Sequence, residues 1–493
     1  MRGLKGYNTP TINHLIAAYG NGFLNVSSGL GFGIPLTTTN NVEFENFLQT
    51  LFFQNYADTP LTYNGSVWSR QHVSKVPLSK YLKTWGERMY LAYIKIANAE
   101  YPSRIWYSDL PINDTIQWGY EQGTNLTTTA GSNLVGSANA GFKTYDLEIG
   151  DPFFITSGSD QGQYRIKEII SDQQVTLNDY NSAATTLTTT ATGVSFWAGG
   201  NWFDVSRDDG DFITWIESNF NQLIIFKRDT LYRYNGSTFS QVKDAPGTTS
   251  GRSVVNIRDW TIYFYGASEH ETGFYAYDST EGYRISNSIA KYINGIDLSI
   301  TPVAWREGNL YRCYVGNISN TDYNISVNNA VISFDYDSKA WSIDPIADIV
   351  KVATEFRSGS TKVSFIGTDD SQVMQTHLGN TLNGEPIVWN ADTKAIFPSG
   401  TDWNNTFTKV RVISENASGV KLLYKRRLAP FNSDNNFMPL GDIRNEMQEF
   451  YFPEDKNRSS GVEYRVQGTS TTEPVAVIKK ISTFYRKETS VLG

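Results

Sequence analysis

The stretch from Asn221 to Gly236 constrains the fold more than any other part of the sequence. It contains an apolar run, Leu223–Phe226, a charged turn, Lys227–Asp229, and an alternating run, Leu231–Tyr234. The dipeptide Asn235-Gly236 follows, and Asn-Gly joins antiparallel strands well because both residues tolerate positive φ. Two short strands and two turns fit in sixteen residues. This arrangement is typical of half a β-propeller blade.

Weaker copies of this segment recur along the chain, and together with the segment itself they number six. Counted from their first strands, neighbouring copies lie roughly 40 to 50 residues apart, except for one gap of about 130. This period is typical of four-stranded blades and predicts a six-bladed propeller. A β-sandwich also yields hairpins at such intervals and is the alternative. The other copies are Leu48–Phe53 with Leu61–Trp68, Arg88–Tyr93 with Arg104–Asp109, Trp260–Tyr265 with Phe274–Asp278, Asn309–Val315 with Val331–Asp335, and Thr361–Ile366 with Val373 and the turn around Asn383-Gly384.

The residue types predict an all-β protein. Tyr, Phe, Trp, Thr, Asn and Gly are abundant in the 493 residues, and they favour strands and tight turns over long helices. Helical periodicity is confined to three short segments, Thr11–Tyr19, Pro77–Lys83 and Ser286–Ile296. Each of them is short enough to be a connector.

The repeats and the stretches between them predict five segments. Residues 1–40 contain the Gly-rich run Asn25–Pro35, which lacks the Gly-Lys-Ser/Thr ending of a phosphate loop and is interpreted as an arm or a closing strand. Residues 41–121 form blades 1 and 2, and residues 200–400 form blades 3 to 6. Between them, short alternating strands flanked by Thr-rich runs predict a small β-barrel at 122–199, inserted between two blades. Longer alternating strands at 401–493 predict a C-terminal β-sandwich.

The usual signatures of catalysis, metal binding and cofactor binding are missing from the sequence. The four histidines are far apart, and the adjacent carboxylates Asp369 and Asp370 are expected to face opposite ways. The weak candidates for a metal site are Asp208, Asp209 and Asp211, which resemble a fragment of a calcium loop. A turn with solvated carboxylates is the preferred interpretation. The single cysteine, Cys313, lies in an apolar strand and is expected to be buried. We therefore expect a chain that is not an enzyme and holds no cofactor.

Charge is distributed unevenly. The net charge is −8, and the residues after Gly400 hold 14 Lys and Arg against 11 Asp and Glu, which gives them +3 and leaves −11 for residues 1–400. An acidic body argues against a surface that grips nucleic acid, although DNA could still slide past it. The densest basic run, Lys425-Arg426-Arg427, is the candidate contact with an acidic partner, or else a solvated strand end. The first residues lack the apolar stretch of a signal peptide, and no run of eighteen uncharged apolar residues suggests a membrane anchor.

Two runs in the predicted blades, Asp211–Lys227 and Gly251–Tyr265, together with the inserted barrel and the final sandwich, resemble bacteriophage tail hub or nozzle proteins. These include the packaged-DNA stabilisation proteins of short-tailed phages. The resemblance spans most of residues 40–490. It rests on the architecture and on the residue types of the strands, without an invariant motif.

The resemblance implies a structural protein of the virion, made in the host cytoplasm and present as a homo-oligomeric ring of six copies. Such a ring forms part of the tail tube, contacts the portal or its adaptor and the tail fibres, retains packaged DNA, and lets it pass without specific binding. An acidic lumen would suit this role because it repels phosphate. The alternatives are a receptor- or glycan-binding propeller and, less favoured, a propeller glycosidase.

Overall fold

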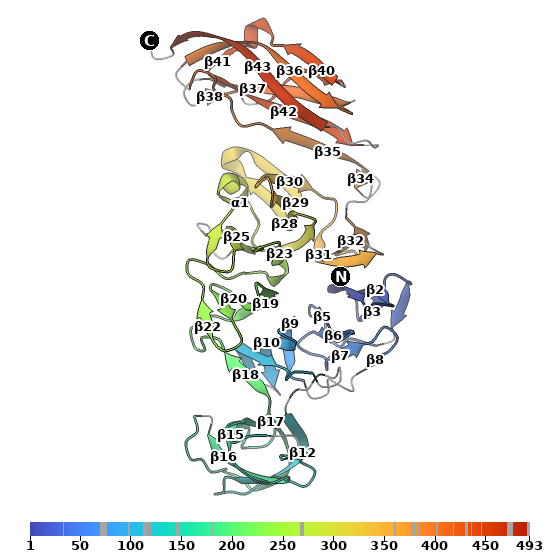
Figure 1. Ribbon diagram of the computed structural model, residues 1–493, viewed down its shortest axis with the longest axis vertical. Coiled ribbons are helices and arrows are strands. Elements are labelled where there is room, and N and C mark those ends of the chain that lie inside the picture. The colour runs from blue at the N-terminus through green and yellow to red at the C-terminus, as the bar shows by residue number, and fades with distance from the viewer. Residues whose placement is uncertain are drawn as a thin grey trace. The chain divides into compact units, whose positions relative to one another are not determined.

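The computed structural model divides into two compact units, Met1–Thr376 and His377–Gly493, which are described separately (Figure 1). It describes the chain apart from residues 33, 70–75, 97–98, 112–115, 117, 119, 144–146, 180, 267–270, 359–360, 377–380, 383–384, 401–402, 418, 429–431, 435, 445, 471–476 and 491–493. None of the helices in the described ranges is long and apolar enough to cross a membrane.

The first unit contains seven small antiparallel sheets and a closed barrel within its described residues. Six of the sheets have four strands and the last has three. The seven sheets are β1 (Gly3–Asn8), β2 (Asn13–Tyr19), β3 (Gly22–Asn25) and β4 (Leu30–Phe32); β5 (Glu43–Phe47), β6 (Thr50–Gln54), β7 (Leu61–Tyr63) and β8 (Trp68–Ser69); β9 (Leu78–Trp85), β10 (Arg88–Ile96), β11 (Ala99–Tyr107) and β18 (Asn201–Asp204); β19 (Ile213–Asn219), β20 (Gln222–Lys227), β21 (Leu231–Tyr234) and β22 (Phe239–Gln241); β23 (Val255–Ile257), β24 (Trp260–Tyr265), β25 (Gly273–Tyr277) and β26 (Gly282–Arg284); β27 (Val303–Glu307), β28 (Leu310–Asn320), β29 (Ile325–Asp335) and β30 (Trp341–Pro345); and β31 (Val350–Ser358), β32 (Thr361–Thr368) and β33 (Val373–Gln375).

The six sequence copies correspond to the second and third strands of six of these sheets. In the segment Asn221–Gly236, β20 and β21 pair antiparallel, and Asn235-Gly236 begins the turn into β22. Gly236 has φ of 100°, and the Asn235 side chain accepts hydrogen bonds from the backbone N–H groups of Ser237 and Thr238. The turn therefore forms where Asn-Gly predicted it, but only Gly236 has positive φ, and Asn235 contributes through its side chain.

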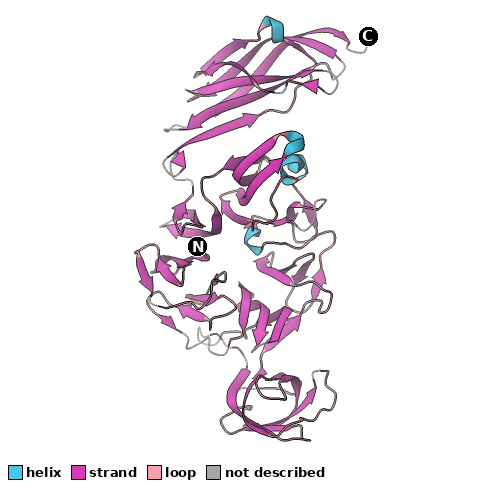
Figure 2. Ribbon diagram, turned by 180° about the vertical axis from the view of Figure 1, so that it is seen from behind, coloured by secondary structure: helices cyan, strands magenta, loops and turns pink. Residues whose placement is uncertain are grey.

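The seven sheets lie around a common centre (Figure 2), and the labels of Figure 1 show that they follow one another in chain order. Each consecutive pair of sheets shares a hydrophobic core, such as the one in which Ile224 and Phe226 pack with Tyr263 and Tyr265. The last sheet packs against the first through a core that includes Leu4. The ring is thus closed by packing of side chains between sheets. The other shared cores join the first to the second sheet, the second to the third, the third to the fourth, the fifth to the sixth, and the sixth to the seventh.

Residues 1–40, expected to be an arm or a closing strand, contain the four strands of an additional sheet. The sequence missed this sheet because Thr11–Tyr19 has helical spacing, whereas residues Asn13–Tyr19 form β2, with its middle residues buried between neighbouring sheets. Pro77–Lys83 was also expected to be helical, but Leu78–Trp85 is strand β9. Short helical turns do occur within Ser286–Ile296, at η2 (Asn287–Ile289) and α1 (Ala290–Ile293).

The barrel is inserted inside one sheet, between its third strand β11 and its fourth strand β18, whereas the spacing had indicated an insertion between two blades. After the barrel the chain returns so that Tyr107 pairs with Asn201 and Arg104 with Asp204. Gly200, at this return, has φ of 91°, and a Cβ there would lie 2.0 Å from the Trp106 ring. The sequence misled because Trp202 begins the region of the clearest repeats, although Asn201–Asp204 forms the fourth strand of the third sheet.

The barrel itself closes through six antiparallel strands in the order β12, β13, β16, β15, β14 and β17. Its interior is apolar, and the rings of Phe153 and Phe196 stack there with centroids 5.5 Å apart. The strands are β12 (Tyr120–Thr128), β13 (Leu134–Ser137), β14 (Pro152–Ile155), β15 (Gly162–Ser171), β16 (Gln174–Asp179) and β17 (Ala191–Gly199).

Within its described residues, the second unit contains two antiparallel sheets that share one hydrophobic core. Val410 and Val412 contribute to this core from one sheet, and Leu422 and Val462 from the other. One sheet holds β34 (Thr381–Leu382), β35 (Glu385–Asp392), β37 (Val420–Leu428), β38 (Asn432–Ser433), β39 (Met438–Ile443) and β42 (Gly461–Ser470). The other holds β36 (Trp403–Glu415), β40 (Glu446–Tyr451), β41 (Arg458–Ser459) and β43 (Val477–Ser490). Single helical turns elsewhere are η1 (Gly251–Ser253), η3 (Thr321–Tyr323) and η4 (Glu454–Lys456).

Candidate functional site at the centre of the seven sheets

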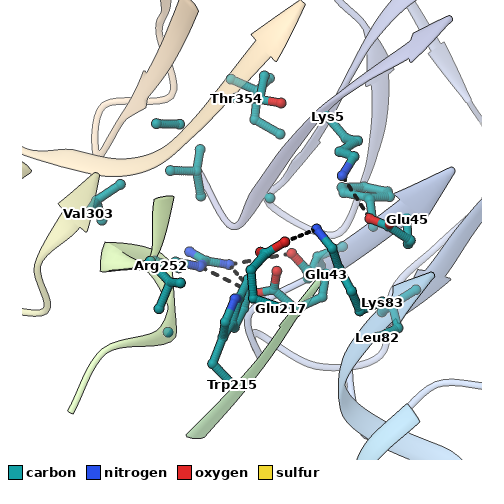
Figure 3. A pocket seen from close by; sticks show the side chains of 18 of the residues that line it. Lys5, Glu43, Glu45, Leu82, Lys83, Trp215, Glu217, Arg252, Val303 and Thr354 are labelled. Atoms are coloured by element: carbon teal, nitrogen blue, oxygen red, sulfur yellow. Dashed lines mark hydrogen bonds and ion pairs between the residues drawn. The ribbon is translucent and has the colours of Figure 1, made fainter. Parts of the chain in front are cut away.

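A cavity of about 170 Å³ lies at the centre of the seven sheets. Every sheet contributes to its wall, six of them through their first strand and the fifth through η1 and Val254 just before β23. Figure 3 shows charged side chains pointing into this cavity from different strands. The charged residues are Lys5, Glu43, Glu45, Lys83, Glu217 and Arg252, and we call them the central cluster.

The central cluster consists of three ion pairs, each joining two different sheets. Lys5 Nζ lies 2.9 Å from Glu45 Oε2, and Lys83 Nζ lies 2.5 Å from Glu217 Oε1. Both carboxylate side chains are only 9% exposed. Arg252 Nη2 lies 3.0 Å from Glu43 Oε1. Charges this well buried are costly to separate, because water cannot replace the missing partner.

Arg252 also donates hydrogen bonds to backbone oxygens at the first and the last of the seven sheets. Its Nη2 donates to the carbonyl of Arg2 at 2.7 Å, and its Nη1 donates to the carbonyl of Lys351 at 3.0 Å. A planar guanidinium can make several such bonds at once, which a lysine could not reproduce. Arg252 therefore links the first, second, fifth and seventh sheets.

The carboxyl groups of the central cluster differ in acidity. Burial raises the pKa of Glu43, and this effect exceeds the opposing attraction of Arg252. Burial would also raise the pKa of Glu45, but Lys5 and Lys83, with hydrogen bonds from Lys5 and Thr84, lower it to about 2. Burial would lower the pKa of Lys83, but Glu217 and Glu45 raise it. At neutral pH, Glu45 and Lys83 therefore carry opposite charges.

The stability of the first unit should fall at acidic pH, because the carboxylate of Glu45 becomes protonated. Its pKa is about 2 in the folded chain against an ordinary value of 4.5, so its contribution is complete above about pH 4.5 and is lost as the pH falls towards 2. The shift corresponds to about 3 kcal/mol. Urea unfolding of the wild type and of Glu45→Gln should show a difference in unfolding free energy that shrinks across this window. A difference independent of pH would contradict this assignment.

The carboxyl groups at the centre are the groups that a hydrolase would need. A glycosidase uses one protonated and one ionised carboxyl facing each other across the sugar, and the raised pKa of Glu43 is a shift in the direction of such an acid. However, Glu43, Glu45 and Glu217 are each bonded to a cation, and the cavity of about 170 Å³ is small for a sugar substrate. The arrangement suits cross-linking of sheets better than proton transfer.

Two larger pockets adjoin the cavity. One, of about 540 Å³, shares Glu43, Trp215 and Arg252 with it and is lined mainly by residues at the beginnings of the first strands. We call it the start-side pocket. The other, of about 590 Å³, shares Lys5 and Thr354 with the cavity and lies at the ends of these strands. The first strands therefore run in the same direction along the centre, with one pocket at each end.

Two of the three aspartates considered as a metal site, Asp209 and Asp211, are bonded to other groups of the chain. Asp209 pairs with Lys227, whose side chain is fully buried, at 2.6 Å, and Asp211 accepts hydrogen bonds from the backbone of Phe212, Arg228 and Asp229. Asp208 is 85% exposed. Among the described residues, no group of three or more His, Cys, Asp or Glu side chains is placed to hold a metal ion. Asp209 and Asp211 hold the start of their sheet together.

The basic run in the second unit is largely engaged within that unit. Arg426 makes a bidentate pair with Asp434 at 2.9 and 3.0 Å, and Arg427 pairs with Glu463. Lys425 lies 5.9 Å from the centroid of the Phe437 ring. The structure therefore gives two of the three cations an internal role, and their contact with an acidic partner stays a prediction.

Cys313 is fully buried in β28, and burial raises the pKa of its thiol to about 12. The expectation of a buried thiol is therefore confirmed. A thiol with so high a pKa is almost entirely protonated at neutral pH, and the protonated form is a poor nucleophile.

The sequence reasoning missed the central cluster. The sequence does not group its members, because they come from five strands or turns and the paired residues lie between 40 and 209 positions apart in the chain. A signal was nevertheless present. Glu45, Lys83 and Glu217 each lie in the strand before a predicted copy, among apolar residues, where a charge needs a buried partner.

Comparison with known proteins gives no family. No protein-family model matches the chain, and no curated protein matches its sequence. Among solved structures, the phage phi92 endosialidase overlaps at 10% identity with a TM-score of 0.22, over 91% of this chain and 72% of that chain. The allergen Mala s 1 of Malassezia sympodialis overlaps at 10% identity with a TM-score of 0.27, over 66% and 86%. The exo-β-1,3-galactanase of Phanerochaete chrysosporium overlaps at 11% identity with a TM-score of 0.18, over 93% and 97%. Overlaps this weak carry no argument about function.

Proposed function

We propose that this chain is a structural protein of a bacteriophage tail, of the hub or nozzle type, that retains packaged DNA and helps to form the channel for its ejection. The resemblance of Asp211–Lys227 and Gly251–Tyr265 to such proteins suggests the class. One observation carries the structural role. The charged side chains at the centre of the seven sheets bind one another and tie the sheets together, which supports a rigid element without catalytic activity.

In this proposal the seven sheets are the blades of a β-propeller. The sequence predicted six blades, and β1–β4 supplies the additional one. The arrangement that supports a propeller is that every sheet contributes to the central cavity and shares a core with the sheet before and after it. The barrel and the second unit then serve as attached modules for contacts with the portal or adaptor, the tail fibres and other tail proteins.

DNA would not pass through the centre of a single chain in this proposal. A cavity of about 170 Å³ crossed by three ion pairs is too small for a DNA strand. The channel would therefore be enclosed by a homo-oligomeric ring of several chains, for which the resemblance suggests six. Residues 1–400 carry a net charge of −11, and an acidic lumen would repel phosphate and let DNA slide.

Electron microscopy of the purified chain, and of virions that contain it, tests the proposal. We expect a ring of copies around an open channel, placed in the tail, with acidic side chains facing the lumen. A monomer that stays monomeric at high concentration and is absent from virions would contradict the structural role. A ring with a basic lumen would leave the tail position intact but would refute the sliding argument.

A further inference from the structure

The start-side pocket has the size and lining of a ligand site. Its volume of about 540 Å³ falls within the range of roughly 300 to 1,000 Å³ that is usual for pockets that bind small molecules. It is concave, and all of its residues belong to the first unit. Nothing in the proposed structural role requires a pocket of this kind, so its lining calls for a separate explanation.

Three aromatic side chains form a wall of the start-side pocket. Tyr81, Phe212 and Trp215 are each half-buried and come from the beginnings of β9 and β19 or the residue before β19. The rings of Tyr81 and Trp215 meet edge to face with centroids 5.6 Å apart. Gly251 lies directly against Trp215, since a Cβ at this glycine would lie 2.3 Å from the indole ring. The wall is therefore fixed in place before any ligand arrives.

The rim of the pocket offers unused hydrogen-bonding groups. Asn41, Thr249 and Thr301 are exposed there, and their side chains have no hydrogen-bond partner in the described part of the chain. Together these groups provide donors and acceptors around an aromatic wall, which is the pattern of a site for a ligand with both apolar and hydroxyl surfaces.

The charged side chains named here for the start-side pocket already have contacts within the chain. Glu43 is bonded to Arg252 at its floor, and the ammonium group of Lys80 lies 3.3 Å from the centroid of the Tyr93 ring. The pocket at the other end is different, because Arg306, Arg357 and Lys362 line it. An anionic ligand would find better partners there. The start-side pocket therefore favours an uncharged ligand.

We propose that the start-side pocket binds an uncharged saccharide. The apolar face of one sugar ring would lie against Tyr81, Phe212 and Trp215, and sugar hydroxyls would bond to Asn41, Thr249 and Thr301. Sugars match this lining because each ring has C–H groups on its faces and hydroxyl groups around its edge. This inference does not depend on a place in the phage tail, and it involves binding without cleavage.

A printed array of bacterial surface and mammalian saccharides tests the inference, followed by calorimetry with the neutral saccharide that binds most strongly. Thr249→Ala and Asn41→Ala should each weaken binding about 5-fold, because each removes one hydrogen bond of about 1 kcal/mol, and the double variant about 25-fold. Both side chains are exposed, so the fold should not suffer. Asn328→Ala, an exposed asparagine of β29 outside the pocket, is the matched control and should bind as the wild type does.

Trp215→Phe provides a second readout. It keeps an aromatic wall but removes one fluorophore, so a change of tryptophan fluorescence on binding that is present in the wild type should shrink in this variant. Binding to no neutral saccharide of the array, binding only to charged ones, or equal affinity of the wild type and the Asn41→Ala/Thr249→Ala variant would each overturn the inference. An intact ring of copies in electron micrographs alongside such a result would leave the structural role standing.

Discussion

Replacing Glu45 by glutamine should lower the free energy of unfolding of the first unit by about 3 kcal/mol at neutral pH. The variant leaves Lys5 without its carboxylate and takes from Lys83 a nearby negative charge, in a place where water cannot fully compensate. The carboxylate is 9% exposed and has a pKa of about 2, which reflects strong attraction to these cations. Urea unfolding followed by tryptophan fluorescence measures the effect.

A matched control and a double variant separate this effect from general damage. Glu281→Gln makes the same chemical change at an exposed position of the first unit and should change the unfolding free energy by less than about 0.5 kcal/mol. Lys5→Met combined with Glu45→Gln should cost less than the sum of the two single changes, because the two side chains interact directly. Additive costs would show that the ion pair contributes nothing.

Replacing Asp204 by alanine should lower the free energy of unfolding of the first unit by about 3 to 5 kcal/mol, which is at least as large as the effect of Glu45→Gln. Asp204 on β18 holds the guanidinium of Arg104 on β11 through bonds of 2.8 and 2.9 Å, and the Arg104 side chain is 0% exposed. The guanidinium also lies 3.6 Å from the centroid of the Trp202 ring. Without the carboxylate, a buried cation would lose its only described ionic partner. Thermal unfolding followed by circular dichroism measures the loss.

The same pair of residue types at the surface serves as the control for Asp204. Asp337 pairs with Arg258 at 2.8 Å, but the two side chains are 53% and 49% exposed. Asp337→Ala should therefore lower the free energy of unfolding by less than about 1 kcal/mol. The double change Arg104→Met with Asp204→Leu should recover part of the stability, because it removes the buried charge together with its partner. If the two aspartate variants were equally stable, burial would not be the cause.

The hairpins could be predicted from the sequence because their determinants are local. Asn235-Gly236 tolerates positive φ, and the alternation in Leu231–Tyr234 places alternate side chains on one face. The strand order within each repeat follows from the short turns. The barrel predicted at 122–199 rested on short alternating strands within one segment, and these strands form a closed barrel. These features depend on residues that are close together in the chain.

The parts that the sequence did not predict depend on distant residues. In β2, the run Leu15–Ala18 is buried on both faces, so it lacks the alternation of a half-exposed strand, and the spacing of its apolar residues predicts a helix. The fourth strand of the third sheet, β18, pairs with β11 across the whole barrel. The central cluster and the start-side pocket likewise bring together residues of several sheets. Contacts between residues that are distant in the chain are difficult to predict from a single sequence.

The packing of the first sheet against the last has a consequence for the order in which the molecule can be made. The faces of β1 and β2 that carry Leu4 and Leu15 find their partners, Val352 and Phe356, only after some 350 further residues have left the ribosome. Closing so long a loop costs about 5 kcal/mol of chain entropy. Apolar surface of the first sheet therefore stays exposed to solvent while the later sheets form. Chaperone binding to nascent chains, or their aggregation, should end when synthesis passes β31.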